Sequence, residues 1–242
     1  MRRFFAEVNP KDNKVLFSEE TYKHIKVLRL NIDETFEVVS NGKSYLCSVR
    51  NIRPFEAEVI REISGDSSRE LEFNLSLACP LLKRGNFELV LQKCVELGVR
   101  DIYPFISSRV IKRVTKSEFE SKRIRYEKII VGACEQSNRT VVPVLHELMD
   151  LKELNNVDAT FKFIAYEDEA IKGEMIPDIE VSDKDKILCL VGPEGGFSRD
   201  EVERATECGY KPVSLGKRIL RAETAIMYML SVVSYKGENK QW

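Results

Sequence analysis

The chain has 242 residues, a formal net charge of −1, 43% hydrophobic residues and 32% charged residues. This is the composition of a globular protein, and the length allows one large domain or two smaller ones. No apolar run approaches the length that crosses a bilayer, and the first ten residues lack the apolar core of a signal peptide. We therefore expect a cytoplasmic protein with no membrane partner.

Residues 1–72 are predicted to form a small β-barrel with one helix. Short runs rich in β-forming residues lie at 36–39, 44–49 and 57–63. Asn41–Gly42 separates the first two runs, and this dipeptide is typical of a two-residue hairpin. A helix is expected at 18–28, with Ser18 at its start. The small polar residues 64–68 are interpreted as the linker that ends this domain.

Residues 73–242 are predicted to form an α/β domain with a mostly parallel sheet. Apolar runs predict buried strands at 73–79, 102–106, 160–166 and 187–191. Helical spacing of apolar residues predicts one helix at 87–97, closed by Gly98, and a longer amphipathic helix at 119–137. Alternation of helices with nearly continuous apolar strands is typical of parallel sheets that are buried on both faces.

Two features concern possible partners. The segment from Lys83 to Arg139 carries thirteen Lys and Arg against seven Asp and Glu, although the whole chain is nearly neutral. Such a local surplus indicates a surface that faces a polyanion, and the alternative is two solvated helix faces. The six cysteines are scattered without any C-x-x-C pair, which indicates buried free thiols. With only two histidines besides, we predict no metal site.

Two glycine-bearing turns lie close together in the sequence, at 192–196 and 215–218. Each follows a short apolar run and leads towards a predicted helix. In open α/β sheets, ligands bind where a buried strand ends in such a turn. The two turns therefore predict one pocket built from the ends of neighbouring strands, with a purely structural turn as the alternative for the first.

The first turn has few features of a phosphate-binding loop. Ser198 and Glu201 have the spacing of a capping box, so a helix begins there, and a helix start suits phosphate. However, the turn is neither a G-x-G-x-x-G nor a P-loop sequence, and Glu194 adds a negative charge. This favours a neutral or cationic ligand and argues against an enzyme that binds nucleotide phosphates. Around the second turn, Leu215 and Ile219 suit a flat aromatic base such as that of an adenosyl group.

The run 190–197 followed by 215–225 resembles the paired signature of the ribosomal RNA small subunit methyltransferase E family. Further segments similar to that family stand in the same order at 3–5, 24–29, 96–99 and 135–139, so the resemblance covers nearly the whole chain. It implies a SPOUT-type domain with a trefoil knot at 73–242, a PUA-like RNA-binding barrel at 1–72, and a homodimer. It also implies S-adenosylmethionine as cofactor and N3 of a uridine in small-subunit (16S) ribosomal RNA, naked or in the subunit, as substrate.

The resemblance implies that the two turns and the helix start after them hold the cofactor. The residues concerned are Leu190, Gly192, Pro193, Glu194, Gly195, Gly196, Leu215, Gly216, Ile219, Leu220, Arg221, Thr224 and Ala225. Methylation at N3 requires loss of a weakly acidic proton and stabilisation of the resulting anion, but no cysteine nucleophile. Arg221 and Arg139 are our candidates for stabilising the anion. Glu223 is the candidate base, with a helix-capping carboxylate as the alternative.

Basic residues outside the turns are candidates for RNA contacts, with a solvated surface role as the alternative for each of them. They are Arg2, Arg3, Arg29, Lys83, Arg84, Arg109, Lys112 and Arg113. A second hypothesis for the whole chain is a ribosome assembly factor of the same fold that binds RNA without turnover. The intact glycines and the run 220–225 favour the enzyme, because a non-catalytic relative would be free to fill the pocket.

Overall fold

The computed structural model describes residues 1–9, 11–63, 69–83, 85–107, 109, 114–167, 175–177 and 180–238. Two compact units divide the chain. The first contains Met1–Glu70 and Val131–Val142, and the second contains Leu71–Ile130 and Pro143–Trp242. Segment 131–142 thus lies in the first unit, whereas the sequence pattern assigned it to the second domain. The predicted linker at 64–68 lies outside the described residues. Among the described helices, none is long and apolar enough to cross a membrane.

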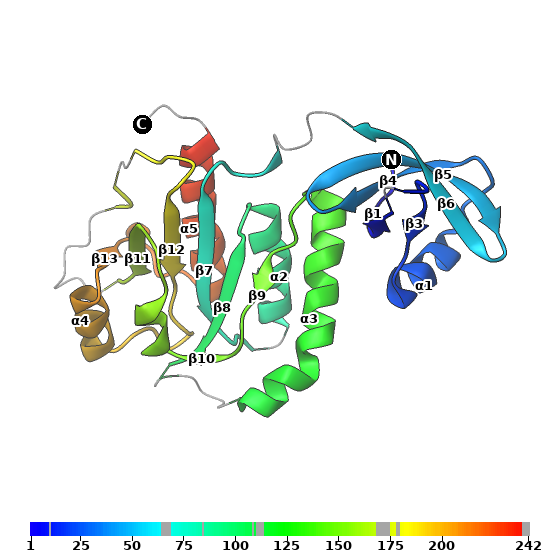
Figure 1. Cartoon of the computed structure of the whole chain (residues 1–242). Helices are drawn as coiled ribbons and strands as arrows, with labels where there is room; N and C mark the ends of the chain where they lie inside the picture. Colours follow the sequence, from blue (N-terminus) through cyan, green and yellow to red (C-terminus); the bar gives the residue numbers. More distant parts are fainter. Residues whose placement is uncertain are drawn as a thin grey trace. The chain divides into compact units, whose positions relative to one another are not determined.

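The first unit is built on an open four-stranded sheet (Figure 1). Its strands, in spatial order, are β1 (Arg3–Phe5), β4 (Thr35–Ser40), β5 (Lys43–Ile52) and β6 (Phe55–Ile63). β1 is parallel to β4, and the other pairs are antiparallel. A separate ribbon is formed by β2 (Glu7–Val8) and β3 (Val15–Leu16). Within the described residues β1 and β6 do not pair with each other, and β6 meets the segment before β3 only at an isolated bridge between Lys14 and Glu58. The closed barrel therefore stays a prediction.

Local sequence signals explain the connections of this unit. Asn41 and Gly42 both have positive φ, 51° and 76°, which is the conformation that joins two strands in a tight hairpin. The predicted hairpin between β4 and β5 is therefore confirmed. Helix α1 (Glu19–Leu28) begins where Ser18 accepts a hydrogen bond from the N–H of Thr21, which confirms Ser18 as its N-cap.

A buried ion-pair network explains why the end of the long helix belongs to the first unit. Arg139 donates from Nη2 to Glu70 at 2.7 Å, and the two side chains are 3% and 7% exposed. Glu70 also accepts the main-chain N–H groups of Thr140 at 2.9 Å and Val141 at 3.1 Å. Arg3 of β1, itself buried, donates at 3.0 Å to the carbonyl oxygen of Arg139. These contacts join segment 131–142 to the rest of the unit.

The second unit contains a parallel sheet, which confirms the predicted α/β class (Figure 1). The spatial order is β10-β8-β7-β12-β11-β13, with β9 also paired to β8, and each of these pairings is parallel. The strands are β7 (Asn74–Pro80), β8 (Asp101–Ile106), β9 (Val144–Leu145), β10 (Met149–Asp150), β11 (Phe161–Ala165), β12 (Lys186–Leu190) and β13 (Tyr210–Val213). The apolar runs of β7 and β12 are almost fully buried, as expected for central strands of a covered sheet.

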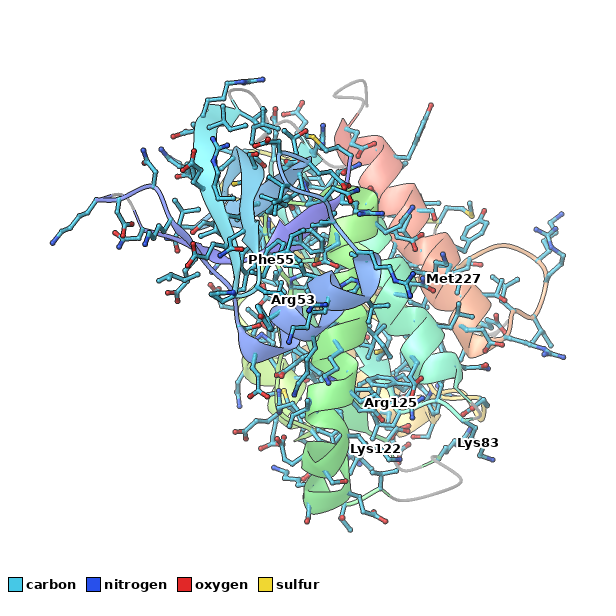
Figure 2. All side chains as sticks on the ribbon, turned by 90° about the vertical axis from the view of Figure 1, so that its right-hand side faces the viewer. Arg53, Phe55, Lys83, Lys122, Arg125 and Met227 are labelled. Atoms are coloured by element: carbon cyan, nitrogen blue, oxygen red, sulfur yellow. The ribbon has the colours of Figure 1, made fainter. Side chains whose placement is uncertain are left out.

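In the part of the chain that the structure describes, four α-helices and one short 3₁₀-helix accompany this sheet. They are α2 (Asn86–Glu96), α3 (Lys116–Ser137), η2 (Glu153–Asn156), α4 (Arg199–Glu207) and α5 (Ala222–Glu238). α2 packs against α5, and α4 packs against β13. α3 is amphipathic as predicted, because Phe119 and Tyr126 are buried while Lys122 and Arg125 extend outward from the helix (Figure 2). Gly98 ends α2 at φ 87°, which confirms the predicted left-handed cap.

Candidate functional site

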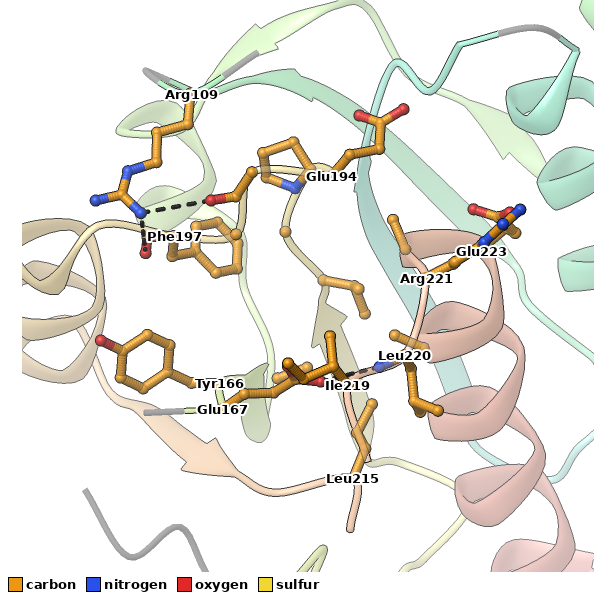
Figure 3. A pocket seen from close by; sticks show the side chains of 18 of the residues that line it. Arg109, Tyr166, Glu167, Glu194, Phe197, Leu215, Ile219, Leu220, Arg221 and Glu223 are labelled. Atoms are coloured by element: carbon orange, nitrogen blue, oxygen red, sulfur yellow. Dashed lines mark hydrogen bonds between the residues drawn. The ribbon is translucent and has the colours of Figure 1, made fainter. Parts of the chain in front are cut away.

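A cavity of about 980 Å³ lies in the second unit, where several parallel strands end. Because the strands are parallel, the loops that follow them meet at one edge of the sheet. Lys83 and Asn86 follow β7, Arg109 follows β8, and the segment 165–167 ends β11. The other lining residues follow β12 and β13, at 191–197, 215, 219–223 and 225 (Figure 3). The predicted convergence of the two glycine turns on one pocket is therefore present in the structure.

The first turn owes its shape to close backbone contacts. The N–H of Gly196, at φ 65°, donates to the carbonyl of Pro193 at 2.8 Å, which closes the turn. A Cβ atom on Gly192 would lie 3.0 Å from the ring of Phe197, so a side chain there would displace that ring. The Phe197 ring in turn stacks at 6.3 Å on Phe105 of β8. The glycine at 192 thus allows the backbone to pass directly over a packed aromatic side chain.

The helix after this turn begins with its first donors already occupied. Ser198 Oγ accepts the N–H of Glu201 at 3.2 Å, and Glu201 accepts the N–H of Ser198 at 2.8 Å. This is the capping box that the sequence predicted. Because these two N–H groups are already bonded, they are not available to a phosphate, which agrees with the absence of a phosphate-loop sequence.

Three carboxylates line the pocket, at Glu167, Glu194 and Glu223. Glu194 Oε1 accepts the main-chain N–H of Lys83 at 3.3 Å, which connects the first glycine turn to the loop after β7. Glu167 Oε1 accepts the N–H of Leu220 at 3.4 Å, which connects the end of β11 to the second turn (Figure 3). Three basic residues, Lys83, Arg109 and Arg221, line the same pocket, so the cavity offers groups of both signs to a ligand.

The second turn supplies the apolar part of the pocket. Gly216, at φ 102°, donates its N–H to Ser214 Oγ at 3.2 Å, and the chain then turns towards α5. Leu215 is buried, whereas the side chain of Ile219 at the pocket is 90% exposed. A large aliphatic side chain this exposed at a cavity is suited to cover a flat apolar ligand group.

The structure brings most of the predicted cofactor residues to this pocket. The lining includes Gly192, Pro193, Glu194, Gly195, Gly196, Leu215, Ile219, Leu220, Arg221 and Ala225. Leu190 lies buried in β12, Gly216 forms the second turn, and Thr224 is exposed on α5, so these three are next to lining residues. Of the candidate catalytic residues, Arg221 and Glu223 line the pocket. Arg139 instead lies in the first unit, in the buried pair with Glu70.

The predicted RNA-contacting residues lie in different environments. Arg2 is exposed and pairs with Glu34 at 3.1 Å, while Arg29 follows the last turn of α1 with φ 48°. Arg3 is buried in the network of the first unit. Lys83 and Arg109 line the pocket. Arg84, Lys112 and Arg113 lie outside the described residues.

Three residues that line the pocket were not predicted from the sequence. Tyr166 and Glu167 immediately follow β11, and Asn86 begins α2. The strand before Tyr166 was predicted, and the rule that ligands bind at the carboxyl ends of parallel strands applies to it as well. That rule was a signal for Tyr166 and Glu167, whereas nothing local in the sequence indicates Asn86.

The chain is similar to known RNA methyltransferases in sequence. Residues 69–234 match the family model of an RNA methyltransferase domain. The chain is 35% identical over 235 residues to ribosomal RNA small subunit methyltransferase E of Mesomycoplasma hyopneumoniae, covering 96% of this chain and 98% of that one. The Bacillus subtilis protein of the same name is 31% identical, with 98% of each chain covered. This chain therefore belongs to the ribosomal RNA small subunit methyltransferase E family.

A solved structure resembles the fold over almost the whole chain. Ribosomal RNA small subunit methyltransferase E from Neisseria gonorrhoeae, in a structure bound to S-adenosyl methionine, has a TM-score of 0.85 and 30% sequence identity. The match covers 97% of each chain. This chain thus shares its fold with that relative over almost its whole length.

Proposed function

We propose that this protein is an S-adenosylmethionine-dependent methyltransferase of the cytoplasm that methylates N3 of a uridine in small-subunit (16S) ribosomal RNA. The observation that carries the proposal is the pocket at the ends of β7, β11, β12 and β13, in a chain that belongs to the methyltransferase family. The N. gonorrhoeae relative, bound to S-adenosyl methionine, supports the choice of cofactor. The names of the relatives support the choice of RNA.

The residues of the pocket fit this cofactor. The glycine turn at 192–196 offers main-chain groups without side-chain obstruction, and Leu215 and Ile219 offer an apolar surface for an adenine ring. Lining residues of both signs, three carboxylates beside Lys83, Arg109 and Arg221, suit a ligand that carries a sulfonium, an ammonium and a carboxylate group. The capping box at the start of α4 already occupies the N–H groups of Ser198 and Glu201, so they do not bind a phosphate. When bound, S-adenosylmethionine supplies the methyl group.

Arg221 and Glu223 are the proposed catalytic residues, and both stand at the start of α5 in the pocket lining. The uridine N3 proton leaves before or during transfer, and a guanidinium next to the base stabilises the resulting anion. Glu223 accepts the proton in this proposal, with a carboxylate that merely stabilises the helix start as the alternative. Burial raises the pKa of the Cys79 and Cys189 thiols to about 12, so neither is a thiolate at neutral pH. This agrees with chemistry that needs no covalent intermediate.

The proposal extends to finer features of the fold. A trefoil knot in the second domain is supported by the family resemblance, in a chain of which residues 69–234 match an RNA methyltransferase domain. A PUA-like barrel at residues 1–72 serves RNA binding, with Arg2 and Arg29 as exposed contacts. A homodimer is supported by exposed tyrosines on α5, Tyr228 and Tyr235.

The RNA-binding role of Lys83, Arg84, Lys112 and Arg113 is supported by the basic surplus of the segment that contains them. Contacts from such residues to phosphate set the affinity and its dependence on salt. The target uridine leaves its stack to reach the pocket, as bases do in other enzymes that modify them.

Mass mapping of small-subunit ribosomal RNA from cells that lack this protein tests the proposal. We expect loss of one methyl group at a uridine, its return with the wild-type gene, and no return with Gly195→Val, whose side chain would meet the backbone of Arg109 and displace the first turn. Unchanged methylation in the deletion strain would overturn the enzyme. Gly195→Val that restores subunit assembly without the methyl group would favour the assembly factor instead.

A further inference from the structure

Arg109, which follows β8, forms hydrogen bonds to the first glycine turn at 192–196 and to Phe197. Arg109 Nη1 donates to the carbonyl oxygen of Gly195 at 3.4 Å and to that of Phe197 at 3.3 Å (Figure 3). These two carbonyls flank Gly196, the residue whose positive φ makes the turn. The N–H of Arg109 is itself anchored, because it donates to the hydroxyl of the buried Ser107 at 3.3 Å.

Main-chain packing reinforces these hydrogen bonds. A Cβ atom on Gly195 would lie 3.2 Å from the carbonyl oxygen of Arg109 and 3.4 Å from its Cβ. The backbone at Arg109 therefore rests directly against Gly195, at a distance that only a glycine accommodates without displacement. On the same side, Phe105 of β8 stacks on Phe197. The end of β8 thus contacts the turn through a ring, through the backbone and through a guanidinium.

These contacts occupy both hydrogen-bonding groups of two peptide units in the turn. The N–H of Gly196 is bonded to Pro193, and the N–H of Ser198 is bonded to Glu201. Arg109 bonds the carbonyls of the same two peptide units, those that follow Gly195 and Phe197. Each of the two units is therefore fixed at both ends by contacts within the chain. A loop that is fixed beforehand loses less conformational freedom when it binds a ligand.

We infer that Arg109 is a positioning residue for the cofactor, which holds the 192–197 turn in its ligand-accepting conformation, and that it is not an RNA phosphate contact. The inference rests on the proposed function for the identity of the ligand. Without the guanidinium, two carbonyls of the turn lose a charged donor, and we expect about tenfold weaker binding of S-adenosylmethionine.

The experiment compares Arg109→Ala and Arg109→Lys with the control Arg199→Ala. Arg199 carries the same charge next to the turn, but its side chain is exposed and pairs with Glu203 on α4. Calorimetry with S-adenosylmethionine should give about tenfold weaker binding for Arg109→Ala, partial recovery for Arg109→Lys, and an unchanged value for the control. Affinity for a 16S ribosomal RNA transcript and its salt slope should remain unchanged in all three variants.

Hydrogen exchange separates the inference from the proposed function, because it needs no cofactor. In the ligand-free protein, Arg109→Ala should accelerate exchange of the amides of Gly196 and Ser198 by about tenfold, while amides of α2 keep their rates. Wild-type binding by Arg109→Ala together with a flatter RNA salt slope would overturn the inference and make Arg109 a phosphate contact. Unchanged exchange in the turn would also overturn it. A wild-type protein that binds no S-adenosylmethionine would instead overturn the proposed function.

Discussion

Glu70→Ala tests the buried ion pair of the first unit. The substitution removes the acceptor of hydrogen bonds from Arg139 Nε, at 3.4 and 3.1 Å, and from its Nη2, at 2.7 Å. It also removes the acceptor of the main-chain N–H groups of Thr140 and Val141. The guanidinium that loses this carboxylate is only 3% exposed. Breaking a buried pair by removing one partner costs about 3–5 kcal/mol. Because a domain's free energy of unfolding is about 5–15 kcal/mol, we expect the first unit to lose a large share of its stability.

Urea unfolding and hydrogen exchange measure this loss. We expect faster exchange at the amide of Thr140 and a lower free energy of unfolding, whereas the control Glu62→Ala, which removes an exposed pair with Lys43, should cost less than about 1 kcal/mol. Replacing both partners, Glu70→Leu with Arg139→Met, should cost less than Glu70→Ala alone, because no unpaired charge is then left buried. A cost below about 1 kcal/mol for Glu70→Ala would refute the reasoning.

The same pair has a pH dependence with a definite sign. Burial alone would raise the pKa of Glu70, but the hydrogen bonds and charge of Arg139 hold the pKa below its ordinary value of 4.5. The stabilisation is therefore complete above pH 4.5 and is lost as the pH falls through the lower pKa of the folded state. Because the Arg139–Glu70 pair stabilises the first unit, a loss of activity in an Arg139 variant can come from unfolding. The folded fraction of the variant must be measured before Arg139 is assigned a role in methyl transfer.

Three further predictions concern other parts of the chain. Gly192→Ala should weaken S-adenosylmethionine binding about tenfold in calorimetry, because the new Cβ lies 3.0 Å from the Phe197 ring, while Gly132→Ala, with open space around it, should have no effect. Burial raises the pKa of Glu135 to about 7. The contribution of the protonated side chain to the free energy of unfolding is therefore complete below pH 4.5 and is lost as the pH rises through 7. Glu135→Gln should therefore gain about 1–2 kcal/mol over wild type at pH 8 in thermal melts, after allowance for solvent screening, and parallel pH profiles would contradict this. Cys208 is exposed and the other five cysteines are buried, so DTNB should titrate one thiol in the folded protein and six after unfolding; a second fast thiol would contradict the structure.

Local signals in the sequence predicted the elements well. The hairpin at Asn41–Gly42, the cap at Ser18 and the capping box at Ser198 each depend on residues within four positions of one another, so their geometry is determined locally. The buried strands at 161–165 and 186–190 were also predicted within one or two residues, because continuous apolar runs bounded by polar turns have few other solutions.

Contacts between distant residues were not predictable in the same way. Arg109 and Arg139 lie in the basic segment 83–139 and Arg3 lies near the N-terminus, and nothing in their sequence neighbours distinguishes a surface contact from a buried one. Their surroundings depend on partners 34 to 136 positions away, such as Glu70 for Arg139 and the carbonyl of Phe197 for Arg109. The charge pattern alone therefore predicts a basic segment, but not which of its side chains face inward.

The exposure of Ile219 has a consequence for the lifetime of the protein. Burying an isoleucine side chain contributes about 1.5–3 kcal/mol, and with 90% of Ile219 in contact with water the fold receives almost none of this contribution. This free energy is gained only when a ligand in the pocket covers Ile219. The free energy of unfolding therefore rises with the logarithm of ligand concentration. We therefore expect the rate at which proteases remove this protein from a cell to follow the cell's supply of methyl donor.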